Sequence, residues 1–442
     1  MAGAFKAYDI RGRTDNDEMT PELARKVGGA FARLTGAPEI AVGRDCRESS
    51  PAIAGALIEG ITEQGSSVLD VGEVATDMIY YVSGVRNVPG AVVTASHNPA
   101  NYNGIKLCRE GAAPVGQDTG LSEIEAMVEK GIPSGSGGGT VETLDVRHGF
   151  IDHLLSVVDS TQMAPLRVAV DGGNGMAGVV LEDVFARIPP ELIGLYLEPD
   201  CTFPNHPPDP LNPENLVDLI ALMASERTDL GVAFDGDADR AFFIDDRGEP
   251  LSGSTTTALI ARWFLARQPG AKIVHNLITS RAVVETIRKH GGTPIRTRVG
   301  HSFIKEVMAK TGAVFGGEHS GHYYFADNFR ADSGMLAMLV LLQVISEDGR
   351  PLSEIRSEVE PYANSGEVNL RVADQTAAVE RVAGAFAEAD LDRQDGLTVG
   401  WTDRWFNIRP SNTEPLLRLN AEGPDDAAVD DLVSRVRAIV EE

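Results

Sequence analysis

Three segments of the chain share one pattern: a short apolar run that begins at a glycine and ends in a loop of reactive side chains. The runs cover residues 90–93, 231–234 and 312–315. Apolar runs of this length, bounded by turn residues, are typical of buried strands. With the three glycines superimposed, Ser96, Asp237 and Glu318 fall at the same offset. The pattern predicts three copies of one strand–loop unit, each with different chemistry in its loop.

The length and the net charge of the chain limit the classes of protein to which it can belong. A chain of 442 residues is too long for one hydrophobic core, and its length favours about three domains. The formal net charge of −26 argues against a nucleic acid or an anionic membrane as partner, because such partners need a basic face. An anionic substrate would therefore need a local basic cluster. The oligomeric state does not follow from the sequence.

The cysteines and the apolar segments help to predict the cellular compartment of the protein. Cys46, Cys108 and Cys201 are widely spaced, without a CxxC pair or an even framework, so we expect neither a disulfide nor a zinc site. The first residues lack the apolar segment of a signal peptide, and the apolar run 335–345 is too short to cross a bilayer. These features predict a cytoplasmic protein.

Most of the chain alternates predicted strands with predicted helices, as in the helix 21–35 and the strand 39–43. Such alternation favours mostly parallel sheets covered by helices. The final segment has alternating strands and a closing helix at 425–440, which indicates an α+β domain. A glycine- and serine-rich tether at 133–139 suggests a first boundary near residue 150. The predicted domains are 1–150, 151–249, 250–360 and 361–442.

The loop after the second apolar run holds three alternating carboxylates, Asp235, Asp237 and Asp239. At this spacing they can converge on one point, where they repel one another unless a cation lies between them. Oxygen ligands of this kind favour Mg²⁺. An EF-hand is excluded because Arg240 stands where its loop needs glycine, and Asp246 where it needs glutamate. A solvated turn rich in Asp and Gly is the alternative.

The first loop places the hydroxyl of Ser96 beside the imidazole of His97, with Lys106 a short way further on. A serine hydroxyl is a poor nucleophile without a base or a metal, and no GxSxG motif surrounds this one, which disfavours a hydrolase. The loop nevertheless follows a predicted strand, where sites of α/β proteins gather. A purely structural turn is the alternative.

The third loop alternates Glu318, Ser320 and His322. A carboxylate and a hydroxyl two residues apart suit paired hydrogen bonds to adjacent sugar hydroxyls. His319 and His322 could bind a metal, but they are not part of the helical HExxH motif that is typical of such sites. A plain polar turn is the alternative here as well.

A fourth polar loop follows the apolar run 405–408 and suits a phosphate dianion, because it combines a guanidinium, hydroxyls, an amide and turn N–H groups. An ordinary turn is the alternative. Taken together, a metal site, a hydroxyl, a polyol site and a remote phosphate site are the parts that phosphoryl transfer to or from a sugar phosphate needs. The residues of this loop are Arg409, Ser411, Asn412 and Thr413, with Arg418 nearby.

In this order along the chain, the motifs resemble those of the α-D-phosphohexomutase family, in particular its bacterial phosphomannomutase/phosphoglucomutase group. The resemblance implies three related mixed α/β domains and a smaller C-terminal α+β, TBP-like domain around a central cleft. The last domain would rotate to close this cleft. The matching segments are 7–12, 94–99, 235–240, 317–322 and 409–413.

The resemblance also implies a reaction. The enzyme would move a phosphoryl group between the 1- and 6-positions of a hexose phosphate, mannose or glucose, through phosphorylated Ser96 and a hexose 1,6-bisphosphate that also serves as activator. Mg²⁺ is the implied cofactor, held by Asp235, Asp237, Asp239 and an oxygen of phosphorylated Ser96.

The resemblance assigns further side chains to the two ends of the substrate. Lys106, Arg240 and Arg11 would line the reacting end. Candidates for proton transfer are His97, Lys106 and His301. Candidates for substrate binding are Tyr8, Arg11, Glu318, Ser320, His322, Arg409, Ser411, Asn412, Thr413 and Arg418.

Three other functions compete with this one. A phosphoglucosamine mutase usually has glycine and glutamine where this chain has Ala238 and His319. In a hydrolase of the haloacid-dehalogenase type, Ser96 would have no role. A catalytically inactive protein that only binds sugar phosphates would not need Ser96 either. Ile278 stands where relatives often place a lysine, which leaves the preferred sugar open.

Overall fold

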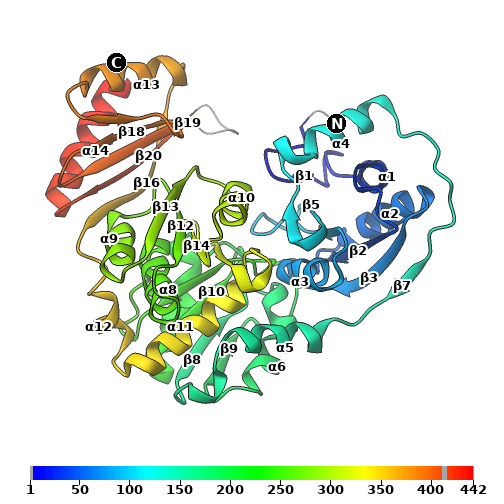
Figure 1. Ribbon diagram of the computed structural model, residues 1–442, viewed down its shortest axis with the longest axis horizontal. Helices are drawn as coiled ribbons and strands as arrows, with labels where there is room; N and C mark the ends of the chain where they lie inside the picture. Colours follow the sequence, from blue (N-terminus) through cyan, green and yellow to red (C-terminus); the bar gives the residue numbers. More distant parts are fainter. Residues whose placement is uncertain (1–2, 411–415, 442) are drawn as a thin grey trace.

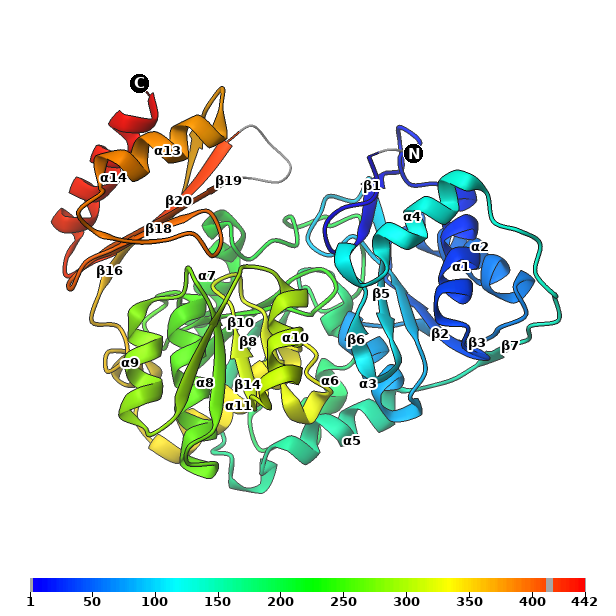
Figure 2. The same cartoon turned by 45° about the horizontal axis from the view of Figure 1, so that its top comes forward.

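The computed structural model describes residues 3–410 and 416–441. These residues form four sheets that follow one another along the chain (Figure 1). The first sheet, blue to cyan, and the last, orange to red, lie at opposite sides of the molecule, with the second and third below and between them; the tilted view in Figure 2 gives the same arrangement. Three mixed α/β units and a C-terminal α+β unit are the fold class that the sequence predicts.

The first sheet has the order β1-β5-β4-β2-β3-β7, with β6 paired to β5. The segment after α4 runs along the outside of this unit and returns to it as β7, parallel to β3, before the second unit begins. The elements are β1 (Ile10–Arg13), α1 (Pro21–Thr35), β2 (Glu39–Arg44), α2 (Ser50–Glu63), β3 (Ser67–Glu73), α3 (Thr76–Arg86), β4 (Gly90–Val93), β5 (Tyr102–Arg109), the 3₁₀ turn η1 (Glu110–Ala112), β6 (Ala113–Pro114), η2 (Gln117–Thr119), α4 (Leu121–Lys130) and β7 (Val141–Thr143).

Local sequence signals set the limits of the first helix. The hydroxyl of Thr20 accepts a hydrogen bond from the backbone N–H of Leu23 at 3.2 Å, and Pro21 occupies the first turn, where its missing N–H has no cost. Gly36 ends the helix with φ 60°, a left-handed conformation that glycine adopts without strain. The predicted bounds of this helix agree with the structure.

The second and third sheets have the orders β11-β10-β8-β9 and β13-β12-β14-β15. The elements of the second unit are α5 (Arg147–Val157), η3 (Ser160–Gln162), β8 (Arg167–Asp171), η4 (Met176–Val179), α6 (Leu181–Phe185), β9 (Glu191–Leu195), η5 (Pro213–Leu216), α7 (Val217–Glu226), β10 (Leu230–Phe234) and β11 (Ala241–Ile244). Those of the third are α8 (Gly253–Arg267), β12 (Lys272–Asn276), α9 (Arg281–Lys289), β13 (Thr293–Thr297), α10 (His301–Thr311), β14 (Phe315–Gly317), β15 (Tyr323–Phe325), η6 (Ala326–Asn328), α11 (Gly334–Asp348) and α12 (Leu352–Arg356).

The threefold strand–loop unit predicted from the sequence is present. The strands β4, β10 and β14 each pair in parallel on one side and, on the other, antiparallel with the strand that follows directly. Each reactive loop therefore joins an antiparallel pair at the carboxyl end of a strand, the edge at which α/β proteins place ligands. The expectation of mostly parallel sheets omitted these antiparallel partners.

One hydrophobic core runs through the first three units. It includes α3 and α5, and the first twelve residues of α11, Gly334–Ile345, are all buried. The apolar run at 335–345 is thus a core helix. Among the helices of residues 3–410 and 416–441, none combines the length and apolar character needed to cross a membrane.

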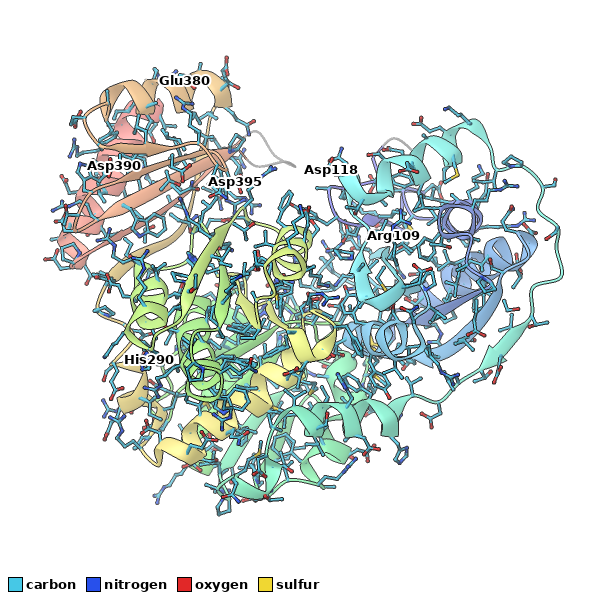
Figure 3. The ribbon with its side chains drawn as sticks, viewed as in Figure 1. Arg109, Asp118, His290, Glu380, Asp390 and Asp395 are labelled. Atoms are coloured by element: carbon cyan, nitrogen blue, oxygen red, sulfur yellow. A yellow bond between two sulfur atoms is a disulfide. The ribbon has the colours of Figure 1, made fainter. Side chains whose placement is uncertain are left out.

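The fourth sheet is antiparallel and has its own core, packed under α13 and α14. Asp395 of this unit accepts a hydrogen bond from the backbone N–H of Val299 at 3.0 Å, and it lies at the side facing the third unit (Figure 3). The elements are β16 (Ala363–Arg371), α13 (Gln375–Ala385), β17 (Asp390–Asp392), β18 (Leu397–Gly400), β19 (Trp405–Pro410), β20 (Leu416–Gly423) and α14 (Asp426–Glu441).

The expectation of no disulfide is wrong. Cys46, in the turn after β2, is bonded to Cys201, in the long loop after β9, with 5.3 Å between the two Cα atoms. The pair is separated by 155 residues in sequence and joins the first unit to the second. Cys108 is free and buried. No pattern in the sequence indicates the bond, because the two turns are brought together by the packing of two domains.

A buried imidazole makes the stability of the third unit depend on pH. Burial lowers the pKa of His275 in β12 to about 4, from the ordinary value near 6.5. The unfolded chain therefore binds a proton that the folded chain excludes, and stability falls as pH drops from about 6.5 toward 4. Between pH 6.5 and 5, we expect His275→Asn to reduce this loss by about 2 kcal/mol.

The measurement is urea unfolding of wild type and variant at the two pH values, followed by circular dichroism. His148→Asn, which replaces an exposed imidazole on α5, is the matched control. An equal loss of stability in wild type and His275→Asn would contradict the role of this imidazole.

Candidate functional site

The loops after β4, β10 and β14 meet where the first three units join. A Cβ atom on Gly236 would lie 2.4 Å from the carbonyl oxygen of Ser96, so only glycine allows the second loop to pack on the first. Arg240 forms an isolated antiparallel bridge with His322 of the third loop. The three loops are therefore in direct backbone contact.

Ser96 is buried and has a left-handed backbone, with φ 52°. Its hydroxyl donates a hydrogen bond to Oδ2 of Asp235 at 2.8 Å and lies 3.3 Å from Nδ1 of His97. Its backbone N–H donates to the hydroxyl of Thr94 at 3.0 Å, which helps to hold the turn. A left-handed conformation is unfavourable for a residue with a Cβ, so the surroundings must stabilise it.

The three aspartates predicted as metal ligands converge. Asp235, Asp237 and Asp239 are buried and can offer one oxygen each within 4.8 Å of one another. The ammonium of Lys106, on β5, donates to Oδ2 of Asp237 at 2.6 Å and to Oδ2 of Asp239 at 2.5 Å. The hydroxyl of Thr76 donates to the same oxygen of Asp237 at 2.6 Å. Thr76 opens α3, whose N-terminus also favours a negative charge.

This cluster fits a divalent cation with oxygen ligands. Within the described part of the chain, Oδ1 of Asp237 and Oδ1 of Asp239 are buried without a hydrogen-bond partner. Buried carboxylate oxygens are costly to leave unpaired, and a cation would pair them. The three candidate ligands Asp235, Asp237 and Asp239 are all carboxylates, which match the preferences of Mg²⁺.

The charges inside the cluster are closely balanced. Burial raises the pKa of Asp235, although the guanidinium of Arg240 acts in the opposite direction. Burial opposes ionisation of Asp237 and Asp239, but the Lys106 ammonium acts in the opposite direction together with Thr76 at Asp237 and with His322 and Arg240 at Asp239, and both pKa values are lowered. Nε of Arg240 donates to Oδ2 of Asp235 at 2.9 Å. The site therefore keeps anionic oxygens available at neutral pH.

The imidazole of His97 is held neutral. Burial lowers its pKa well below the ordinary value, and the nearby Arg240 and Arg11 guanidinium groups add to this effect. A neutral imidazole next to a hydroxyl can accept its proton. Arg11 reaches the same loop, because its Nη1 donates to Oδ1 of Asn98 at 2.6 Å.

The third loop is organised around Glu318. Its two carboxylate oxygens accept hydrogen bonds from the hydroxyl of Tyr324 at 2.6 Å and from the backbone N–H of Gly300 at 3.1 Å. The hydroxyl of Ser320 lies 3.0 Å from Nδ1 of His322. Glu318 and Ser320 thus stand in one loop with fixed orientations.

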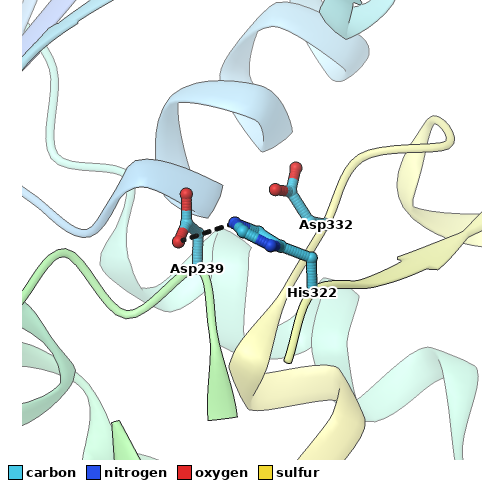
Figure 4. A group of neighbouring side chains, drawn as sticks. All are labelled: Asp239, His322 and Asp332. Carbon is cyan, nitrogen blue, oxygen red and sulfur yellow. Dashed lines mark ion pairs between the residues drawn. The ribbon is translucent and has the colours of Figure 1, made fainter. Parts of the chain in front are cut away.

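His322 connects this loop to the metal-ligand candidates (Figure 4). Its Nε2 is 3.8 Å from Oδ1 of Asp239, the ion pair drawn as a dashed line. Asp332 points toward the same imidazole, and its carboxylate is paired with the ammonium of Lys305 at 2.6 Å. The charge of Asp332 is therefore already balanced by a buried lysine.

The remaining predicted residues lie on the first, third and fourth units. The hydroxyl of Tyr8 donates to the carbonyl oxygen of Val299 at 3.3 Å and so contacts the third unit. Arg409 and Arg418 stand opposite each other on β19 and β20, and both approach Glu367, at 3.3 and 3.5 Å. Ser411, Asn412 and Thr413 lie outside the described residues, and so does the side chain of His301.

Sequence reasoning missed several residues of the site. Thr76 and Tyr324 each hold a predicted site carboxylate, yet neither has a motif around it. Arg47 donates hydrogen bonds to the loop of Ser96 and could have been suspected from the charged pair it forms with Asp45 after a buried strand. Ile278 is buried against Leu277 and Trp405 of the fourth unit, so it serves a contact between domains.

Comparisons with known proteins agree with this geometry. Profiles of phosphoglucomutase/phosphomannomutase, alpha/beta/alpha domains I, II and III, match residues 2–133, 148–248 and 252–362, and that of the C-terminal domain matches residues 367–439. These domains and this loop arrangement define a phosphohexomutase-type protein. The chain belongs to the phosphoglucomutase/phosphomannomutase family, as its motifs predicted.

Individual relatives cover nearly the whole chain. A phosphomannomutase of Salmonella montevideo is 40% identical over 96% of this chain and 95% of its own. A protein of Xanthomonas campestris described as phosphohexose mutases is 39% identical over 96% of each chain. The crystal structure of a phosphoglucomutase/phosphomannomutase family protein from Burkholderia thailandensis has a TM-score of 0.90 at 31% identity, covering 99% of this chain and 97% of that one.

The carboxylate cluster yields a direct binding test. We expect Asp237→Asn to raise the dissociation constant for Mg²⁺ at least about tenfold, because it removes one charge from a three-carboxylate site. Isothermal titration calorimetry on purified protein measures the constant. Asp246→Asn, which alters an exposed carboxylate after β11, is the matched control. Equal Mg²⁺ affinity in Asp237→Asn and wild type would show that the cation does not bind at this cluster.

Proposed function

We propose that the protein interconverts hexose 1-phosphate and hexose 6-phosphate, with Ser96 as the carrier of the phosphoryl group and a hexose 1,6-bisphosphate as intermediate. One observation carries the proposal: the hydroxyl of Ser96 lies 2.8 Å from a carboxylate of a buried cluster that suits Mg²⁺, beside two cationic side chains. Phosphoryl transfer needs this combination of a positioned oxygen and concentrated positive charge.

The phosphoryl group moves between two oxygens in each half of the cycle. In the first half, phosphorylated Ser96 donates its phosphoryl group to the free hydroxyl of the substrate, which loses its proton. The bond between phosphorus and the serine oxygen breaks, and that oxygen takes up a proton. The bisphosphate then turns end for end. In the second half the hydroxyl of Ser96 accepts the other phosphoryl group, which restores the phosphorylated serine. No net phosphate is consumed, so the reaction is an isomerisation.

Asp235, Asp237 and Asp239, together with an oxygen of phosphorylated Ser96, would hold the Mg²⁺ ion. The ion supplies positive charge next to the donor and the transferred group. Oδ1 of Asp237 and Oδ1 of Asp239 are buried without a hydrogen-bond partner in the described part of the chain, which supports this assignment.

Cationic side chains supply the rest of the positive charge. Lys106 and Arg240 both contact the carboxylate cluster and can therefore reach a phosphoryl group on Ser96. Nη2 of Arg240 is buried without a hydrogen-bond partner among the described residues, so it has a donor to offer an anion. These groups give a chain with a net charge of −26 a local site for an anionic substrate.

Removal of the proton from the hydroxyl of Ser96 needs a group that is unprotonated at physiological pH. His97 has this property, since burial lowers its pKa, and its Nδ1 is 3.3 Å from the serine oxygen. Lys106 is held as an ammonium by two carboxylates and is better suited to stabilise charge. We therefore assign His97 as the general base toward Ser96 and Lys106 as an electrostatic stabiliser.

A sugar that reacts at both ends must be recognised by features common to its two orientations. Glu318 and Ser320 would hydrogen-bond the 3- and 4-hydroxyls, which occupy equivalent places when the sugar is turned. A site that does not contact the 2-hydroxyl cannot separate mannose from glucose, because a missing contact gives no discrimination.

The end of the substrate that is not reacting carries the other phosphate. Arg409 and Arg418 would bind it, helped by Ser411, Asn412 and Thr413, which lie outside the described residues. The two guanidinium groups contact Glu367 at 3.3 and 3.5 Å, which keeps them in place between turnovers. The curated relatives described as phosphomannomutase support a mannose phosphate as one substrate.

The phosphoserine assignment leads to a test of activity. We expect Ser96→Ala to lower turnover at least about a thousandfold, because the phosphoryl group then has no carrier. The assay couples mannose 1-phosphate conversion to a dehydrogenase, with a trace of glucose 1,6-bisphosphate and Mg²⁺. Ser134→Ala, in the exposed tether, is the matched control and should behave like wild type.

Thermal unfolding of both variants shows whether the fold is retained. Wild-type turnover in a folded Ser96→Ala protein would contradict the proposal. Loss of turnover in both Ser96→Ala and Ser134→Ala would also count against it, since the defect would then not be specific to Ser96.

A further inference from the structure

Arg47 is a buried arginine, 1% exposed, whose hydrogen bonds converge on the loop of Ser96. Its Nε donates to Oδ2 of Asp45 at 3.0 Å, which fixes the plane of the guanidinium. The other four hydrogen bonds go to backbone carbonyl oxygens of one turn. These acceptors are Ser96 (2.9 Å), Asn98 (2.8 Å), Pro99 (2.6 Å) and Tyr102 (3.1 Å).

These contacts determine the shape of the loop. A planar guanidinium with five donors can hold four carbonyl oxygens in one arrangement, which a lysine cannot do. One of the four belongs to Ser96 itself, whose left-handed φ of 52° needs support from its surroundings. Arg47 therefore fixes the direction of the serine hydroxyl without touching the reacting atoms.

The disulfide flanks this arginine. Cys46 directly precedes Arg47, and its partner Cys201 lies two residues before Phe203. The ring of Phe203 lies over the guanidinium, with 5.2 Å between its centroid and Cζ of Arg47. Phe203 has φ 53°, and its backbone N–H donates to the carbonyl oxygen of Asp200 at 2.8 Å. The Cys46–Cys201 disulfide thus holds the ring of Phe203 in place over the guanidinium of Arg47.

The same region also supports the metal-ligand loop. Sγ of Cys46 lies 3.7 Å from the carbonyl oxygen of Asn174 in the turn after β8. Two residues on, the backbone N–H of Met176 donates to the carbonyl oxygen of Gly236 at 2.9 Å. Gly236 packs on the backbone of Ser96. The disulfide is therefore linked to both loops that meet at the hydroxyl of Ser96. It is linked to the loop of Ser96 through Arg47, and to the loop of Gly236 through the turn after β8.

Small molecules can reach the sulfur atoms. Cys46 is partly exposed, and both cysteines line a surface cavity of about 540 Å³. Glu48, Glu198 and Asp200 stand in the same lining, so a neutral thiol has better access than an anionic one. The free cysteine, Cys108, is buried elsewhere in β5.

We propose that the Cys46–Cys201 disulfide is a redox-controlled brace that acts through the positioning residue Arg47 on the loop of Ser96. The inference about turnover rests on the function proposed above, whereas the inference about loop order does not. In the oxidised protein the brace keeps Phe203 over Arg47 and keeps the turn of Ser96 in one conformation. Reduction releases the Cys201 loop, admits water to the guanidinium and loosens the turn.

The chemical step is thiol–disulfide exchange. A thiolate of a dithiol reductant attacks one sulfur of the bond and releases the other cysteine as a thiol. The second thiol of the reductant then attacks the reductant's own sulfur in the mixed disulfide and releases the remaining cysteine. The protein gains two protons and two electrons as Cys46 and Cys201 become thiols. The reductant loses the same number and becomes an organic disulfide. Oxidation is the reverse reaction with an organic disulfide as the electron acceptor.

The experiment compares oxidised and reduced full-length protein. Dithiothreitol, a neutral dithiol, is the probe, and alkylation followed by mass spectrometry counts free cysteines in each form. We expect one free cysteine before reduction and three after it. Hydrogen exchange of the peptide 94–102 should become about fivefold faster on reduction. Turnover of mannose 1-phosphate should fall about threefold or more, with little change in KM, because a misplaced nucleophile affects chemistry more than binding.

Two variants separate the brace from other effects of the reductant. Cys201→Ser should resemble the reduced protein and should not respond to dithiothreitol. Arg47→Lys should lose turnover more than tenfold, should keep its KM and should respond little to reduction, because the two changes act through one network. If Arg47→Lys does not fold, the comparison of oxidised and reduced wild type decides alone.

Several results would overturn the proposal. Three free cysteines in protein kept under oxidising conditions would show that the bond does not form. Unchanged exchange of 94–102 on reduction would show that the bond does not order the loop. An equal effect of dithiothreitol on wild type and Cys201→Ser would assign the effect to another group.

One result would separate the two proposals. Protein without mutase activity in either form, but with redox-dependent hydrogen exchange of residues 94–102, would contradict the proposed function and support the brace.

Discussion

The structure depends on the balance of charge around three buried aspartates at the end of β10. Their carboxylates would repel one another in a dry interior, and the Lys106 ammonium and the Arg240 guanidinium offset this repulsion. Lys106 comes from the first unit, so the balance requires the first two units to be docked. The same contacts place the hydroxyl of Ser96 against Asp235. The three carboxylates are thus brought beside Ser96 and Lys106 only when the first two units are together.

The three repeated units explain how this assembly arises. Each places one loop at the carboxyl end of a strand that pairs in parallel on one side and antiparallel on the other. A shared core beneath them, through α3, α5 and α11, fixes the loops relative to one another. The fourth unit keeps its own core and meets the third through polar contacts such as Asp395 with Val299, and through the packing of Trp405 on Ile278. Its arginines can therefore face the site without belonging to the central core.

Features encoded locally could be predicted from the sequence, and features created by domain packing could not. The helix at 21–35 has its cap, its proline and its terminal glycine within the segment, and the three aspartates are two residues apart. By contrast, Cys46 meets Cys201 across 155 residues, and Thr76 reaches Asp237 across 161. No pattern within either segment indicates its partner. The antiparallel strands after β4, β10 and β14 were missed for the same reason, since pairing is not visible in a short segment.

In the proposed reaction, Ser96 holds the phosphoryl group between the two halves of the cycle. The most direct measurement mixes the protein with glucose 1,6-bisphosphate carrying labelled phosphate, in the presence of Mg²⁺, and locates the label by peptide mapping. The account predicts label on the peptide that contains Ser96, and loss of this label when unlabelled hexose phosphate is added in excess. Label on a different residue, or no covalent label during turnover, would contradict it.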